Sequence, residues 1–81
     1  MDLVGAKLTI LKALPKSSED FTFVIQLAQK VRMDGGDIFR GILLDLVRDD
    51  LAVNNGPNRF KRTSSGDAVV LQIQQQAHAF M

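Results

Sequence analysis

The sequence predicts one small domain that is mostly α-helical and contains a short β-hairpin. Apolar residues recur every three or four positions in four segments, which is the spacing of amphipathic helices. The pair Gly35-Gly36 separates the second of these segments from the third, and the turn-rich stretch 54–58 lies between two short segments of strand-like composition. A chain of 81 residues has room for a single core, so we expect one domain over residues 1–81.

A first helix is expected over about Leu3–Leu14. Its apolar residues at helical spacing are Val4, Leu8, Leu11 and Leu14, with Leu3 and Ile10 beside them. Pro15 ends this helix, because the residue before a proline is disfavoured in the α region.

A second helix is expected from a cap at Ser17 or Ser18 to about Arg32. A serine cap followed by the acids Glu19 and Asp20 is a common helix start, because these groups satisfy free N–H groups and complement the helix dipole. The residues expected on its apolar side are Phe21, Phe23, Val24, Ile25, Leu27, Ala28 and Val31, and those on its polar side are Thr22, Gln26, Gln29 and Lys30.

The segment Met33–Asp37 is predicted to be a tight turn before a third helix. Its two glycines allow the positive φ that a sharp corner between helices needs. Asp34 or Asp37 can cap the third helix, which should run to about Asp50. The stripe expected in the core consists of Ile38, Phe39, Ile42, Leu43, Leu46 and Val47.

A β-hairpin is expected next. It consists of a strand over Leu51–Val53, a turn over Asn54–Asn58 and a returning strand over Arg59–Thr63. Alternation along the second strand puts Phe60 and Arg62 on one face and Arg59 and Lys61 on the other. Phe60 is expected to point into the core, which leaves Arg59 and Lys61 outward.

A last helix is expected over about Asp67–Ala79. Its inner face should consist of Val69, Val70, Ile73, Ala77 and Phe80. Leu71 falls on the opposite side, among glutamines.

Composition argues against several classes of function. The chain has no cysteine and a single histidine, His78, so we expect no disulfide framework and no metal site. It also has no tyrosine and no phosphate-binding glycine loop, so we expect no enzyme activity, no cofactor and no small-molecule substrate. No run of about 18 apolar residues and no signal pattern are present, so a cytoplasmic protein without a membrane partner is expected.

Charge is unevenly distributed, although the net charge is only +1. Residues 34–50 contain five aspartates and two arginines, whereas residues 51–63 contain three cations and no acid. The predicted third helix is therefore acidic and the predicted hairpin is basic. A phosphate backbone would be attracted to the hairpin.

The predicted order of helix, helix, turn, helix, hairpin and helix resembles the winged helix-turn-helix regulators of the MarR-like and PadR-like bacterial families. Leu27-Ala28 followed by Val31 is similar to the "LA…lg" centre of their second helix. The residues similar to the end of their recognition helix and the start of their wing are Ile42, Leu43, Leu46, Leu51 and Val53, and Arg59–Gly66 is similar to their "Y-x-L-T-x-x-G" segment. The likeness covers roughly Ile10–Ile73 and implies a three-helix core, a wing and a C-terminal helix. Asp50 stands where the family pattern has a glycine.

The resemblance implies a DNA-binding protein, such as a transcriptional regulator or an accessory factor, with double-stranded DNA as its partner. DNA contacts need side chains that donate hydrogen bonds to phosphates and base edges. The predicted nucleic-acid-binding residues are Arg40 and Arg48 on the third helix and Asn55, Asn58, Arg59, Lys61 and Arg62 in the hairpin. The rest of the outward face of the third helix is Asp37, Gly41, Leu44 and Asp45, which offer no such donor.

Other roles remain open for these residues. Arg40 and Arg48 follow Asp37 and Asp45 by three positions, which is the spacing of ion pairs within a helix. The cations of the second strand can also protect a sheet edge from aggregation. The alternative function is a winged-helix module for protein–protein interaction or assembly. A homodimer is expected, and the candidate interface residues are Leu44, Leu71 and Phe80.

Overall fold

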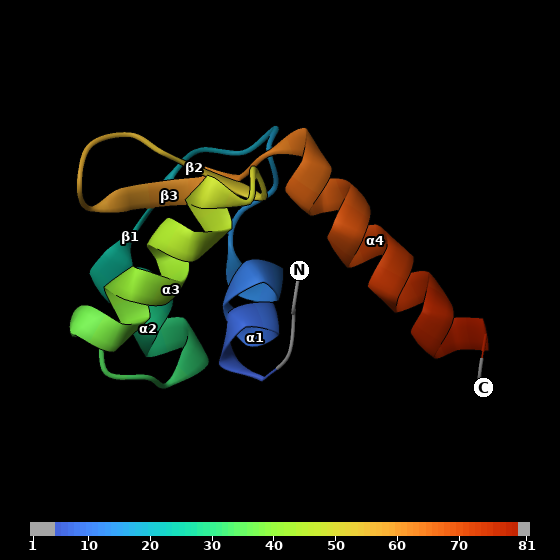
Figure 1. The fold of residues 1–81 in the computed structure, drawn as a ribbon, viewed down its shortest axis with the longest axis horizontal. Helices are drawn as coiled ribbons and strands as arrows, with labels where there is room; N and C mark the ends of the chain where they lie inside the picture. Colours follow the sequence, from blue (N-terminus) through green and yellow to red (C-terminus); the bar gives the residue numbers. More distant parts are fainter. Residues whose placement is uncertain (1–4, 80–81) are drawn as a thin grey trace.

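The fold is mostly α-helical and includes a small antiparallel sheet (Figure 1). The computed structural model describes the backbone of residues 5–79 and the side chains of residues 5–76. The elements are α1 (Ala6–Ala13), β1 (Thr22–Phe23), α2 (Val24–Val31), α3 (Asp37–Arg48), β2 (Ala52–Asn54), β3 (Arg59–Arg62) and α4 (Ser64–Ala79). The predicted combination of helices with a hairpin is confirmed, and one strand, β1, was not predicted.

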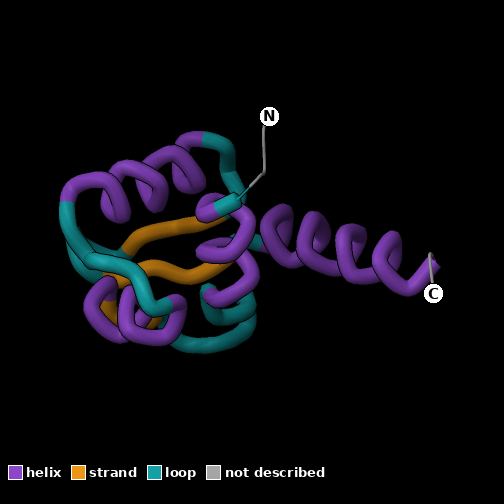
Figure 2. The backbone as a smooth tube through the Cα atoms, turned by 90° about the horizontal axis from the view of Figure 1, so that it is seen from below, coloured by secondary structure: helices purple, strands orange, loops and turns teal. Residues whose placement is uncertain are grey.

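The sheet has the strand order β1-β3-β2, and both pairs are antiparallel. Strands β2 and β3 form the predicted hairpin, in which Val53 pairs with Lys61. Strand β1 adds to the other edge of β3 through the pairs Thr22–Phe60 and Phe23–Arg59. Figure 2 shows the strands from below, with the C-terminal helix α4 extending away from them.

The second helix is shorter than predicted. It begins at Val24, and the residues before it pair with β3, because aromatic and β-branched side chains such as Phe23 and Thr22 suit a strand. The prediction of a cap at Ser17 or Ser18 was therefore wrong. As a result, Phe23 and Ile25 are 49% and 68% exposed rather than buried on an inner helix face.

The core lies between α1, α2, α3 and the inner face of the sheet. Its largest fully buried side chains are Phe39, Ile10, Leu11, Leu27, Leu43 and Leu46. Phe60 is buried as predicted, and Val70 of α4 completes the cluster. The predicted stripe of α3 is confirmed at Phe39, Leu43 and Leu46. It was wrong at Ile38, which is 82% exposed because Phe39 takes the inward position in the first turn.

Helices α2 and α3 end in the same hydrogen-bonded motif. Arg32 after α2 and Asp50 after α3 adopt left-handed conformations, with φ of 58° and 61°. At each end the next amide, that of Met33 or Leu51, donates to a carbonyl five residues earlier. This is the Schellman motif, in which glycine usually takes the left-handed position. The motif turns the chain toward α3 in one case and toward the hairpin in the other.

The last helix, α4, leaves the body of the protein. Its first turns pack against α1 and β3, and the rest projects outward (Figures 1 and 2). Leu71 is exposed, as expected, and Val70 is buried. Phe80, a candidate interface residue, lies outside the described residues.

Candidate nucleic-acid interface

The outward side of α3 lies beside the loop between β2 and β3. Arg40 connects the two, because its Nη1 donates to the Pro57 carbonyl at 3.2 Å and its Nη2 donates to Asn58 Oδ1 at 2.9 Å. A shallow pocket of about 180 Å³ follows this junction and is lined by Arg40, Leu44, Asn54, Pro57 and Phe60. Helix and loop thus form one continuous surface. We call it the α3–loop surface and define it by Arg40, Leu44, Asp45 and Arg48 together with residues 54–59.

Arg48 lies on the exposed side of α3. Its Nη1 is 3.6 Å from Asp45 Oδ1, so the pairing expected from their spacing is confirmed. The Arg48 side chain is 79% exposed, and a surface pair of this kind contributes at most about 1 kcal/mol. Arg48 is therefore accessible to other anions.

Three predicted residues lie in or beside the loop of the hairpin. Asn55, Asn58 and Arg59 are all exposed. The Asn55 backbone amide donates to the Arg59 carbonyl at 2.9 Å, which closes the turn without using either side chain. The Arg59 guanidinium lies 5.9 Å from the centre of the Phe23 ring on the neighbouring strand. A cation–π contact of this kind orients the guanidinium and leaves its donors free.

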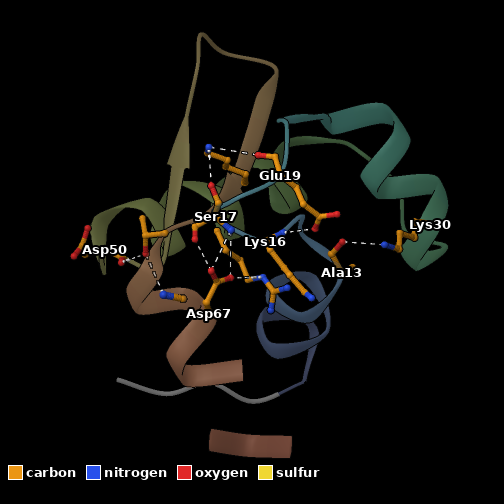
Figure 3. A network of polar contacts seen from close by, with 11 residues as sticks. Ala13, Lys16, Ser17, Glu19, Lys30, Asp50 and Asp67 are labelled. Carbon is orange, nitrogen blue, oxygen red and sulfur yellow. Dashed lines mark hydrogen bonds and ion pairs between the residues drawn. The ribbon is translucent and has the colours of Figure 1, made fainter. Parts of the chain in front are cut away.

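Lys61 holds the segment before β1 against the sheet. Its Nζ donates to the backbone carbonyls of Ser17 at 3.0 Å and Glu19 at 3.4 Å (Figure 3), and it lies 4.8 Å from the centre of the Phe21 ring. The half-buried Lys61 is therefore occupied within the fold. It does not join the α3–loop surface.

Arg62 also points away from that surface. It is only 7% exposed, and its Nε lies 3.3 Å from Asp67 Oδ1 on α4. Of the seven predicted nucleic-acid-binding residues, Arg40 contacts Asn58 directly, Asn55 and Arg59 lie in or beside the same loop, and Arg48 lies about two turns further along α3. The structure places Lys61 and Arg62 elsewhere, and Arg62 is not accessible to a nucleic acid at the hairpin surface.

Asp67 is the centre of a polar network between the segment before β1 and α4. Its Oδ2 accepts from the Ser17 hydroxyl at 2.5 Å and from the Ser17 amide at 3.1 Å (Figure 3). Burial acts to raise the pKa of Asp67. The hydrogen bonds from Ser17 and the charges of Arg62 and Lys16 together outweigh burial and lower this pKa below its usual value. Asp67 therefore remains ionised in the folded protein and fixes the start of α4.

Two exposed apolar residues extend the candidate surface. Phe23 and Ile25 line a second shallow pocket, of about 250 Å³, together with Val24, Arg40 and Asn58. Sequence reasoning missed their position because it assigned them to the inner face of a longer helix. The run Thr22-Phe23-Val24-Ile25 contained the signal, since all four residue types favour strands over helices.

The described part of the chain contains neither a helix that is long and apolar enough to cross a membrane nor a group of three acidic or histidine side chains suited to a metal ion. Comparisons with models of protein families, with curated proteins and with solved structures found no match to this chain.

Proposed function

We propose that this chain is a winged helix-turn-helix domain that binds double-stranded DNA. In this proposal α3 is the helix presented to DNA and the β2-β3 hairpin is the wing. The observation that carries the proposal is the pair of hydrogen bonds from Arg40 to Pro57 and Asn58, because they hold the wing against α3 as one surface. The order of the elements along the chain supports the same assignment.

Phosphate contacts are assigned to the exposed donors of the α3–loop surface. Arg48 and Arg59 supply the charge, and the amides of Asn55 and Asn58 supply neutral donors. Asp45 and Leu44 occupy the positions from which a recognition helix usually reads bases. We therefore propose binding that depends mainly on phosphates and reads sequence weakly, as in a small regulator or an accessory factor.

Interaction with a protein is the second candidate function. It is favoured by the exposed apolar side chains around Arg40, namely Phe23, Ile25 and Leu44, with Ile38 at the start of α3. Aromatic, aliphatic and arginine side chains are typical of the centres of protein interfaces. A homodimer that buries Leu44 or the exposed Leu71 belongs to this second candidate.

A DNA titration with two matched double variants separates these functions. Fluorescence anisotropy of a labelled duplex is measured at several salt concentrations for the native chain, for Arg48→Ala with Arg59→Ala, and for Ile25→Ser with Leu44→Ser. Each phosphate contact contributes about 0.9 to the slope of log K against log salt, so the arginine variant should lower this slope by about 2 and weaken binding. The Ile25/Leu44 variant should bind DNA almost normally. Loss of DNA binding only in the Ile25/Leu44 variant, or no binding of the native chain at low salt, contradicts the DNA proposal.

A further inference from the structure

A groove of about 310 Å³ lies between α1 and α4, formed by residues outside the α3–loop surface. Its cations are Lys12 and Lys16, at the end of α1 and just after it, and Arg62 at the end of β3. Its apolar wall is Val70 and Leu71 of α4, and Gln74 lies further along the same helix. None of these residues takes part in the proposed DNA contact.

Arg62 is the deepest charged group of the groove. Its side chain is only 9% exposed, and its ion pair within the described residues joins Nε to Asp67 Oδ1 at 3.3 Å. The Nε–H makes no well-directed hydrogen bond there. A guanidinium has five N–H donors, and buried donors normally have acceptors. Because Nε is buried, only the terminal Nη groups of Arg62 can reach a ligand in the groove, and they are suited to bind a carboxylate or a phosphate.

Charge around the groove favours an acidic ligand. Three cations face one carboxylate, that of Asp67, so the lining has a net charge of +2. Both oxygens of Asp67 already take part in contacts within the fold, with Ser17 and Arg62. Lys12 and Lys16 are exposed, and within residues 5–76 the structure gives their ammonium groups no ion pair. The groove can thus accept more than one negative group.

The shape of the groove favours a peptide over a small molecule. Sites for small molecules usually bury about 70–90% of the ligand surface. Here the wall residue Leu71 is 56% exposed, so the groove is open along α4. A peptide with adjacent carboxylates and an apolar side chain beside them would match the cations and Leu71.

We propose that the groove between α1 and α4 binds an acidic segment of a partner protein. Its carboxylates bind Lys12, Lys16 and Arg62, and an apolar side chain beside them packs on Leu71. This site is independent of the α3–loop surface. The domain then has two binding faces of different chemistry.

The first test is an NMR titration of the whole ¹⁵N-labelled chain with the blocked peptide acetyl-Leu-Glu-Glu-Leu-amide. We expect saturable shift changes at the amides of Lys12, Lys16, Asp67 and Gln74. The same peptide with glutamine in place of glutamate should leave these amides unchanged. Equal binding of the glutamine peptide, or equal shifts and affinity with inorganic phosphate alone, overturns the proposal of an acidic peptide. If the same shifts appeared when the protein concentration was raised without peptide, the groove would bind a second copy of the chain. That result would also overturn the proposal of an acidic peptide.

The second test compares two double variants that each remove two positive charges. Lys12→Ala with Lys16→Ala should weaken the glutamate peptide at least about threefold, since each exposed pair contributes a few tenths of a kcal/mol or more. Arg48→Ala with Arg59→Ala should leave peptide binding unchanged. In a DNA titration the Arg48/Arg59 variant should lose affinity and the Lys12/Lys16 variant should bind almost normally. Failure of the DNA proposal and failure of the peptide proposal are therefore distinguishable. An equal loss of peptide binding in both variants would show that only net charge matters and would refute the groove.

Discussion

Gly66, in the first turn of α4, lies against the backbone of Leu51, just before the hairpin. A Cβ added there would lie 2.1 Å from the Leu51 carbonyl oxygen, a backbone atom that cannot move aside alone. Gly41, in the middle of α3, has no atom within 4 Å of the equivalent position. The same substitution should therefore have opposite effects at these two glycines.

We expect Gly66→Ala to lower the free energy of unfolding by about 2 kcal/mol or more, because a close-packed contact must open. Gly41→Ala should raise it by about 0.5–1 kcal/mol, because alanine favours a helix interior. Urea denaturation followed by circular dichroism measures both. Equal stability of the two variants would show that the approach of α4 to Leu51 is not close in solution.

The ionised Asp67 should stabilise the folded protein, and this stabilisation should be lost as the pH becomes acidic. Its pKa is lowered in the folded state, so its contribution is fully present above the unfolded value of about 3.9 and is lost as the pH falls through the lower folded value. At neutral pH, Asp67→Asn should cost about 1–2 kcal/mol, because two hydrogen bonds to a charged group are weakened. Denaturation at pH 7 and at pH values below 3.9 should show the difference from the native chain shrinking in acid.

The matched control for that substitution is Asp45→Asn, which removes the same charge from an exposed ion pair. Its effect at pH 7 should stay within about 0.5 kcal/mol. A cost as large as that of Asp67→Asn would mean that loss of negative charge, rather than the network at Ser17, causes the destabilisation.

Single residues were predictable from the sequence where their partners are near in the chain. The burial of Phe60 follows from strand alternation, and the pairing of Asp45 with Arg48 follows from helical spacing. The same alternation places Arg62 beside Phe60 on the buried face, and its partner Asp67 is only five positions away. The anchoring of Lys61 was not predictable in this way, because its Nζ binds a carbonyl 44 positions away. That contact depends on tertiary packing, which a local sequence pattern does not show.

At the scale of elements, the ends of α2 and α3 determine how the chain turns. Both helices end with a left-handed residue that is not glycine, and in an L-residue this conformation costs about 1–2 kcal/mol. At Asp50 the chain reverses with a positive φ, a conformation that glycine adopts without strain.

Arg32→Gly should therefore stabilise the protein by about 0.5–1 kcal/mol, since glycine adopts a positive φ without strain and loses only part of this gain to its greater freedom when unfolded. The control is Arg48→Gly in the last turn of α3, which removes the same charge at a helical position and should destabilise by up to about 1 kcal/mol. Thermal unfolding by calorimetry measures both. A lower melting temperature for Arg32→Gly would contradict the role of the left-handed cap.

Most elements could be predicted because their apolar spacing is regular. Strand β1 was the exception, and it was missed because the segment before it contains a plausible serine cap followed by acids. Pairing of Thr22 and Phe23 with β3 prevailed over that local preference. The error had a consequence for the site, since it hid the exposure of Phe23 and Ile25 beside Arg40.

At the scale of the whole molecule, two faces are available for binding. The α3–loop surface combines exposed donors with exposed apolar groups, and the groove between α1 and α4 combines three cations with an open apolar wall. The mostly helical fold with its hairpin was predictable from composition and periodicity. The site was predictable only in part, because five of the seven candidate residues lie on α3 or in and beside the hairpin loop, and two are used inside the fold.

The location of the DNA contact is the most direct test of the central proposal. The ¹⁵N-labelled chain is titrated with a short duplex at low and at higher salt, and the shifts of the backbone amides are mapped. We expect saturable changes at Arg48 and along Asn55–Arg59 that weaken as salt is raised. No change at low salt, or changes confined to α1 and α4, would contradict DNA binding by the α3–loop surface.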